Sequence, residues 1–199
     1  MSLQFATIRD RHCAQVVRTK AFCQRTEQAS QASKVWTDLG MIMGLEEDVK
    51  EHVLHKIRHT AKKYAQTMIN VEPADKDDDE LLALLAYGCG TTIGTLADPR
   101  NGVRQAGEEL SVDGVVVCQL PATRLETVAL MTAAHAVFYT KFTGPCRALF
   151  EILYTECGIR CKPSWLITEG VGGYPGSVEP ASEMPTSNDW RPVAHLWFK

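Results

Sequence analysis

The chain has 199 residues, of which 45% are hydrophobic and 23% are charged, as is ordinary for one globular domain. A formal net charge of −3 leaves no basic excess for neutralising phosphates, so we expect no nucleic-acid partner. No apolar run approaches the roughly 20 residues of a membrane span, and no apolar stretch follows Arg9, Asp10 and Arg11 as in a secretory signal. We therefore expect a cytoplasmic protein without a membrane partner.

Cysteine usage is consistent with that location. The number of cysteines is odd, and no Cys-x-x-Cys pair occurs. We expect reduced thiols, several of them buried as small apolar groups. The seven cysteines are Cys13, Cys23, Cys89, Cys118, Cys146, Cys157 and Cys161.

The first 35 residues carry the weakest pattern. Residues 5–8 and 14–22 have the composition of strands, whereas residues 24–34 are polar and favour a loop or a solvated helix. From about Leu45 to Asn70 apolar residues recur at helical spacing, which predicts a long amphipathic helix.

Three histidines, His52, His55 and His59, lie on this expected helix at positions i, i+3 and i+7. Such a spacing can bring imidazoles together around a metal ion. On a helical wheel the three occupy an arc of about 60° away from the centre of the apolar stripe. We expect them to face water beside Lys62 and Lys63, so we predict no metal and no cofactor and keep the histidines only as a weak metal candidate.

An acidic segment, residues 72–80, follows the helix. It lacks the Gly and Glu positions of a calcium-binding loop. We expect a solvated linker in which one of residues 77–79 caps a helix that begins near Glu80. That helix should stop at the glycines of residues 87–90.

Residues 91–170 alternate between short patterns. Residues 91–96 predict a strand, and residues 98–102 predict a turn. Asp113-Gly114 is a turn signal before a strand of β-branched residues, which Pro121 should end. Residues 125–130 resume an extended pattern that predicts a further strand.

Helical spacing begins at Ala133 and continues to Cys157. Gly144-Pro145 interrupts it, so we predict two helical segments rather than one straight helix. Gly158 suits the left-handed position after a helix. Beyond it, residues 164–169 and 193–198 predict strands, and the glycine-rich loop between them lacks the Lys of a phosphate-binding loop.

A strand ending in Leu-Pro-Ala, a second strand and a long helix with an internal Gly-Pro resemble the second half of a GyrI-like domain, as does the Asp98-Pro99 loop before them. This domain also serves as the effector-binding domain of some bacterial transcription activators. The variant most similar here is that of the testis-expressed ER-phagy receptor of animals. The resemblance is strongest over residues 85–170.

The resemblance implies an α+β fold in which duplicated βααββ-type halves form an antiparallel sheet with helices packed on one face. Residues 1–199 would form one GyrI-like domain, with its first strand within residues 4–22. It also implies a groove for a hydrophobic or aromatic small molecule, lined by aromatic rings and holding a glutamate that pairs with cationic ligands. The usual place for that glutamate, near the start of the last strand, is Val193-Ala194 here and carries no acid.

The remaining candidates for this acid are Glu126 and Glu169, both on expected strands. The resemblance implies a small-molecule-binding protein without a DNA-binding segment. One alternative is a hydrolase on the same fold, with Glu126 or Glu169 as a general base whose pKa burial would raise. Another is a protein-interaction module with a protein partner, so the question of enzyme activity stays open. The candidate ligand-lining aromatic residues are Tyr139, Trp165, Tyr174 and Trp197.

Familiar catalytic motifs are absent from the sequence. His135, Cys118 and Cys146 supply the residue types of a thiol site. Nothing in their spacing indicates that they meet.

Overall fold

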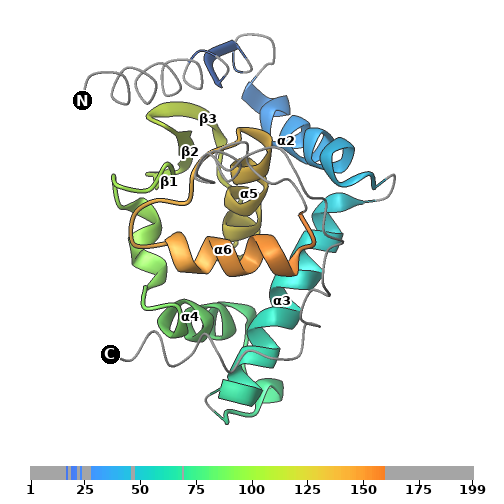
Figure 1. The fold of residues 1–199 in the computed structure, drawn as a ribbon, viewed down its shortest axis with the longest axis vertical. Coiled ribbons are helices and arrows are strands. Elements are labelled where there is room, and N and C mark those ends of the chain that lie inside the picture. Colours follow the sequence, from blue (N-terminus) through green and yellow to red (C-terminus); the bar gives the residue numbers. More distant parts are fainter. Residues whose placement is uncertain are drawn as a thin grey trace, which may run out of the picture. The chain divides into compact units, whose positions relative to one another are not determined.

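A computed structural model describes residues 17, 19–21, 23, 28–45, 48–68 and 70–159. All of them belong to one compact unit of the chain, residues 1–166. They form helices and one three-stranded antiparallel sheet, which confirms the α+β class (Figure 1). Duplication of a βααββ unit is not shown, and a single domain over residues 1–199 stays a prediction.

Five α-helices carry the labels of Figure 1. They are α2 (Gln28–Met43), α3 (Val49–Met68), α4 (Asp78–Gly88), α5 (Arg124–Val137) and α6 (Arg147–Glu156). Two short 3-10 helices are η1 (Pro73–Asp75) and η2 (Ile93–Ala97), and the strands are β1 (Val103–Ala106), β2 (Glu109–Val112) and β3 (Val115–Gln119). Among the described helices, none combines the length and the apolar character that crossing a bilayer requires.

Helix α5 lies at the centre of this unit, where it contacts α2, α3, α4, α6 and β1 (Figure 1). Eleven of its fourteen residues are buried, so it lacks the polar face of a surface helix. Apart from His135, its buried side chains are small or apolar, with four alanines and two threonines among them. Small side chains let several neighbours approach one helix closely, and this explains why α5 is surrounded.

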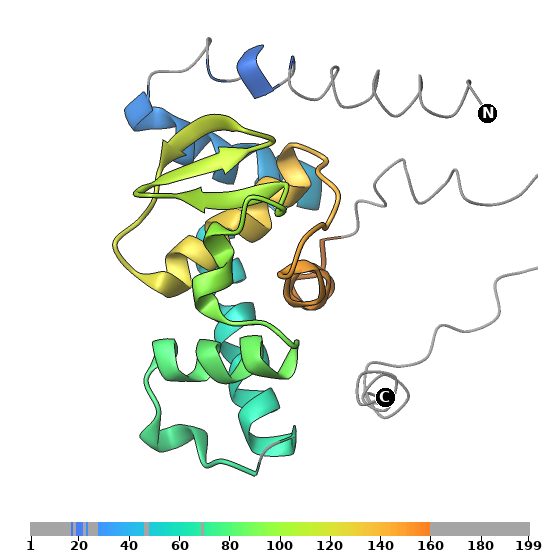
Figure 2. The same cartoon turned by 90° about the vertical axis from the view of Figure 1, so that its left-hand side faces the viewer.

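The sheet follows the order β1-β2-β3 through two hairpins. Asp113 and Gly114 have φ values of 48° and 81°, the left-handed conformation that a two-residue hairpin turn requires, as their sequence predicted. β3 ends at Gln119, before Pro121, as predicted. Figure 2 shows the sheet in front of α2 and α5, and the contacts of α2 with β3 and of α5 with β1 agree with this view.

Several helix boundaries confirm the sequence predictions. The side chain of Asp77 caps α4 by accepting a hydrogen bond from the Glu80 N–H at 2.8 Å. Helices α5 and α6 are separate segments on either side of Gly144-Pro145. Gly158 has a φ of 73°, and the Ile159 N–H donates to the Tyr154 carbonyl at 3.2 Å, as in a glycine-terminated helix.

Three predictions are wrong. Residues 91–96 were expected to form a strand, but η2 occupies most of them. Residues 125–130 belong to α5, because Thr123 and Glu126 cap its first turn: the Thr123 Oγ1 accepts from the Glu126 N–H at 3.2 Å and donates to Glu126 Oε2 at 3.0 Å. The described residues within 14–22 are helical, which contradicts a strand there.

The loop before α6 is fastened to the turn after η2. Asn101 is buried, donates to the Thr95 carbonyl at 2.8 Å and accepts from the Cys146 N–H at 3.4 Å. Thr143 Oγ1 accepts from the Gly102 N–H and donates to the Arg100 carbonyl, both at 3.0 Å. These bonds hold the start of α6 against a segment some forty residues earlier in the chain.

Gly144 should be required at this junction for two reasons. It has a φ of 71°, and a Cβ there would lie 2.4 Å from Asn101 Oδ1. We expect Gly144→Ala to lower the free energy of unfolding by about 1–3 kcal/mol more than Gly107→Ala in urea titrations. Gly107 is the matched control, because its φ is 66° and a Cβ there meets nothing within 4 Å. Equal losses in the two variants would contradict a clash with Asn101.

Candidate functional site

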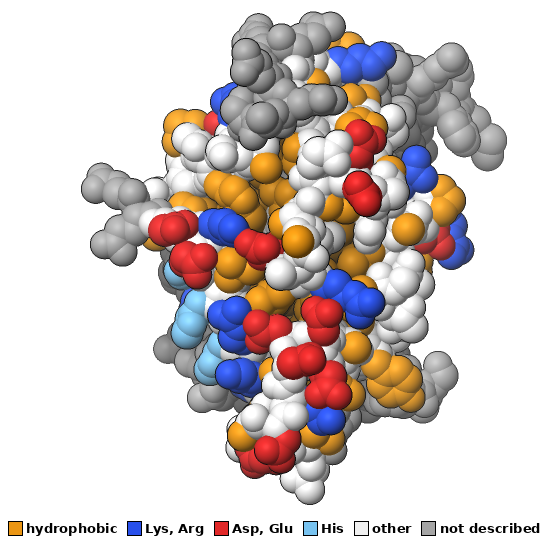
Figure 3. Space-filling view, turned by 180° about the vertical axis from the view of Figure 1, so that it is seen from behind, with side chains coloured by type: hydrophobic (Ala, Val, Ile, Leu, Met, Phe, Trp, Pro, Cys, Tyr) orange, Lys and Arg blue, Asp and Glu red, His pale blue; other side chains and the backbone are white. Residues whose placement is uncertain are grey.

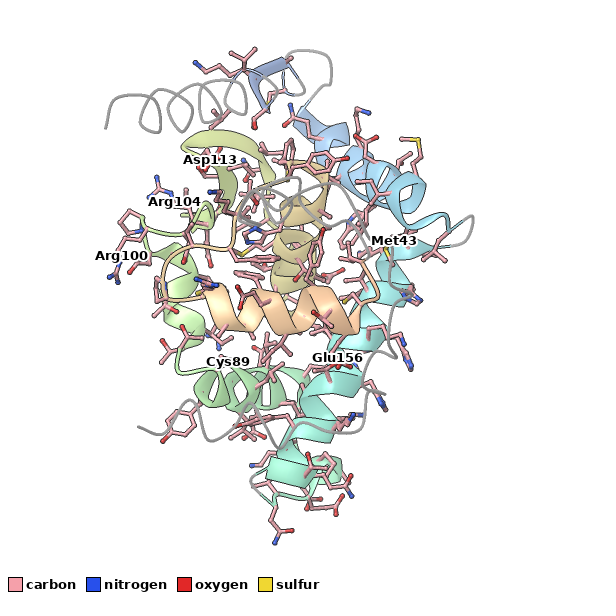
Figure 4. All side chains as sticks on the ribbon, viewed as in Figure 1. Met43, Cys89, Arg100, Arg104, Asp113 and Glu156 are labelled. Atoms are coloured by element: carbon pink, nitrogen blue, oxygen red, sulfur yellow. The ribbon has the colours of Figure 1, made fainter. Side chains whose placement is uncertain are left out.

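A groove of about 550 Å³ lies at the corner between α2 and α3. Figure 4 labels Met43, the last residue of α2, at this corner. We call this hollow the corner groove. Its lining residues are Trp36, Thr37, Gly40, Met41, Gly44, Leu45, Asp48, Val49 and Lys50.

Apolar side chains supply about half of the surface of the corner groove. Met41 is 71% exposed and Leu45 is 37% exposed, and both line the groove together with half-buried Trp36. A Cβ on Gly40 would lie 3.0 Å from Val49 Cγ2, so the glycine lets α2 and α3 meet closely. An exposed cluster of large apolar side chains in a hollow is typical of a binding surface.

The polar side of the groove is formed by the start of α3. Asp48 caps α3 by accepting from the Glu51 N–H at 3.3 Å. Lys50 Nζ lies 2.6 Å from Glu126 Oε1 on α5. The hydrogen bond from Lys50, with a smaller contribution from Thr123, lowers the pKa of the Glu126 carboxyl, and the same ion pair raises the pKa of Lys50.

Glu126 is therefore placed differently from its sequence prediction. It lies in the first turn of a helix rather than on a strand, and it contacts the corner groove only through Lys50. A general base near neutral pH needs a raised pKa, whereas the pKa of Glu126 is lowered. Its carboxylate is an ion-pair and capping group.

The other predicted ligand residues are not brought to this groove within the part of the chain that the structure describes. Tyr139 is exposed on the turn after α5 and is absent from the lining. Glu169, Trp165, Tyr174 and Trp197 lie outside the described residues, as do Cys13 and Cys161. Sequence reasoning missed Trp36, Met41 and Leu45. The available signal was that Gly40 and Gly44 interrupt the largely apolar stretch that begins at Val35.

His52, His55 and His59 lie on α3, where His52 is half-buried and the other two are exposed. The rings of His55 and His59 stack with centroids 6.4 Å apart. No group of three or more His, Cys, Asp or Glu side chains suited to a metal ion occurs within residues that the structure describes. Figure 3 shows histidines at one edge of the rear face, where acidic and basic side chains alternate.

His135 is the one buried side chain in the described ranges with a polar atom, Nε2, that has no hydrogen-bond partner. Its Nδ1 lies 2.6 Å from Thr140 Oγ1, and its ring packs against Phe142 and Phe150 with centroids 4.8 Å away. Burial lowers the pKa of His135 to about 3, so the imidazole is neutral. Among the described residues, no hydrogen bond joins it to Cys118 or Cys146.

The five described cysteines, Cys23, Cys89, Cys118, Cys146 and Cys157, are free thiols. Burial raises the pKa of Cys89 and of Cys118 to about 11 and that of Cys157 to about 12. Protonated thiols are poor nucleophiles. These three cysteines therefore act as small apolar core groups.

No family model, curated protein or solved structure matches the chain. The resemblance of residues 85–170 to GyrI-like domains therefore stays a prediction.

His135 should make the protein sensitive to acid. The unfolded chain binds this proton with a pKa near 6.5 and the folded chain with a pKa near 3, so between these values the unfolded state holds more protons. The free energy of unfolding should fall as the pH falls, by up to about 1.4 kcal/mol per pH unit from this group. We expect His135→Phe, which keeps a ring between Phe142 and Phe150, to flatten that slope between pH 6.5 and 5 in urea titrations.

Carboxylates titrate at lower pH, so their contribution to this window is small. A wild-type slope that persists unchanged in His135→Phe would show that the imidazole is not the group responsible.

Proposed function

We propose that this chain is a binding protein that takes a small, flat, apolar ligand in the corner groove. The observation that carries the proposal is the apolar lining of half-buried Trp36 and exposed Met41 and Leu45 in a hollow of about 550 Å³. Small-molecule sites are commonly concave, mostly apolar and roughly 300–1,000 Å³ in volume. The ring of Trp36 supplies a face for an aromatic ligand.

The charges beside the groove favour uncharged or cationic aromatic molecules. Lys50 is engaged by Glu126, and Asp48 adds a second carboxylate near it. The nearby side chains therefore carry a small negative excess. A cation over an indole face is also attracted by the ring itself. This agrees with the ligand class that the GyrI-like resemblance implies.

The hydrolase alternative has less support. Its described candidate, Glu126, is held ionised by Lys50 and is not a lining residue. The interaction-module alternative fits the openness of the groove, since Met41 projects well into solvent. A partner side chain would bury the same apolar atoms as a small ligand.

A thermal-shift screen with neutral aromatics, aromatic cations and aromatic anions tests the proposal. A ligand at about 100 times its dissociation constant stabilises the folded state by about 2.7 kcal/mol, which raises the Tm by roughly 5–10 °C. We expect neutral or cationic aromatics to give this shift and Met41→Ser to reduce it, because the variant removes apolar contact area.

Tyr87→Ser is the matched control. Tyr87 is 75% exposed on α4 and is absent from the groove lining, so its loss should leave the ligand shift unchanged. A ligand-induced Tm shift that is unchanged in Met41→Ser would show that the ligand binds outside the corner groove. A shift abolished only by Glu126→Gln would favour the glutamate-based alternative, and no shift with any compound would overturn the small-molecule function.

A further inference from the structure

A second cavity of about 340 Å³ lies beside the first turn of α5 and shares no lining residue with the corner groove. We call it the hairpin cavity, because the ends of β1 and β3 and the β1–β2 turn border it. Its lining residues are Ile93, Leu96, Gln105, Gly107, Glu108, Gln119, Leu120, Pro121, Ala122, Thr123, Arg124 and Thr127.

Two charged residues of opposite sign, Arg124 and Glu108, line the hairpin cavity. The Arg124 side chain is 63% exposed, and its ion pair with Asp79 is long, at 3.8 Å. Within the described part of the chain, the Glu108 carboxylate has no ion pair or hydrogen bond. The Glu108 carboxylate is therefore available to a ligand, and Arg124 is engaged only by a long ion pair.

The rest of the lining is apolar or offers uncharged polar groups. Half-buried Ile93 and Leu120 supply aliphatic surface. Gln119 donates through Nε2 to Glu109 Oε1 at 3.1 Å, and Gln105 donates to the Gly107 carbonyl at 3.0 Å. Each donation leaves the amide oxygen of that glutamine as an acceptor.

We propose that the hairpin cavity binds a small zwitterion with an apolar body, such as an amino acid with an apolar side chain. Arg124 would hold the carboxylate, since a guanidinium presents paired N–H donors that match a carboxylate. Glu108, with the glutamine amide oxygens, would receive the ammonium group. The paired charges of the lining sum to zero, which disfavours a ligand with a net charge of either sign.

Three compounds that share one ring separate the two charge requirements: L-phenylalanine, 3-phenylpropanoate without the ammonium, and 2-phenylethylamine without the carboxylate. Their dissociation constants are measured with the full chain by isothermal titration calorimetry or ligand-observed NMR. We expect L-phenylalanine to bind about tenfold more tightly than either analogue, because each analogue lacks one of the two charge-assisted hydrogen-bonding groups.

Arg124→Gln should weaken the binding of L-phenylalanine about tenfold and leave the affinity for 2-phenylethylamine unchanged. Glu108→Gln should raise the affinity for 3-phenylpropanoate relative to that for L-phenylalanine. Arg147→Gln is the matched control, because Arg147 also begins a helix, is 65% exposed and does not line the cavity. Both arginine side chains are mostly exposed, so neither variant should disturb folding.

The proposal is overturned if L-phenylalanine shows no binding at 10 mM, a concentration that corresponds to a binding free energy of roughly −2.7 kcal/mol. It is also overturned if either analogue binds as tightly as L-phenylalanine. Equal losses in Arg124→Gln and Arg147→Gln would also overturn it. Met41→Ser should not affect this binding, so failure here and failure of the corner-groove function are distinguishable.

Discussion

The enclosure of α5 is the constraint on which the rest of the described structure depends. A helix buried on nearly every side loses access to water, so its side chains must be small, apolar or internally bonded. Four alanines meet this requirement, and Thr132 meets it by donating to the Val128 carbonyl at 2.8 Å. Helices α2, α3, α4 and α6 and strand β1 all contact α5, so their positions depend in part on the same element.

The first turn of α5 links both candidate binding regions. Glu126 holds Lys50 at the corner groove, while Thr123, Arg124 and Thr127 line the hairpin cavity. The turn itself is fixed by its own cap, which the side chains of Thr123 and Glu126 form together. Neighbouring side chains on one capped turn thus border two separate hollows, so the position of the turn affects the geometry of both.

Local chemistry explains which elements the sequence predicted correctly. The Asp113-Gly114 turn, the Asp77 cap and the glycine after α6 depend on residues a few positions apart. Residues 125–130 were misassigned because their extended-looking pattern reflects burial on all sides, and burial hides the one-sided periodicity of an ordinary helix. The Thr-x-x-Glu cap was the overlooked signal. The corner groove joins two helices at a bend, and periodicity within each helix cannot show what the bend brings together.

The two ends of α6 each carry a buried thiol, Cys146 at the start and Cys157 at the end. A buried cysteine reacts with an alkylating reagent only when its surroundings open. The labelling rate at each cysteine therefore reports the free energy of local opening at that end. The Asn101 hydrogen bonds hold the first end of α6, and the glycine-terminated turn holds the second. A comparison of the labelling rates at Cys146 and Cys157 therefore shows which end of the helix opens more readily.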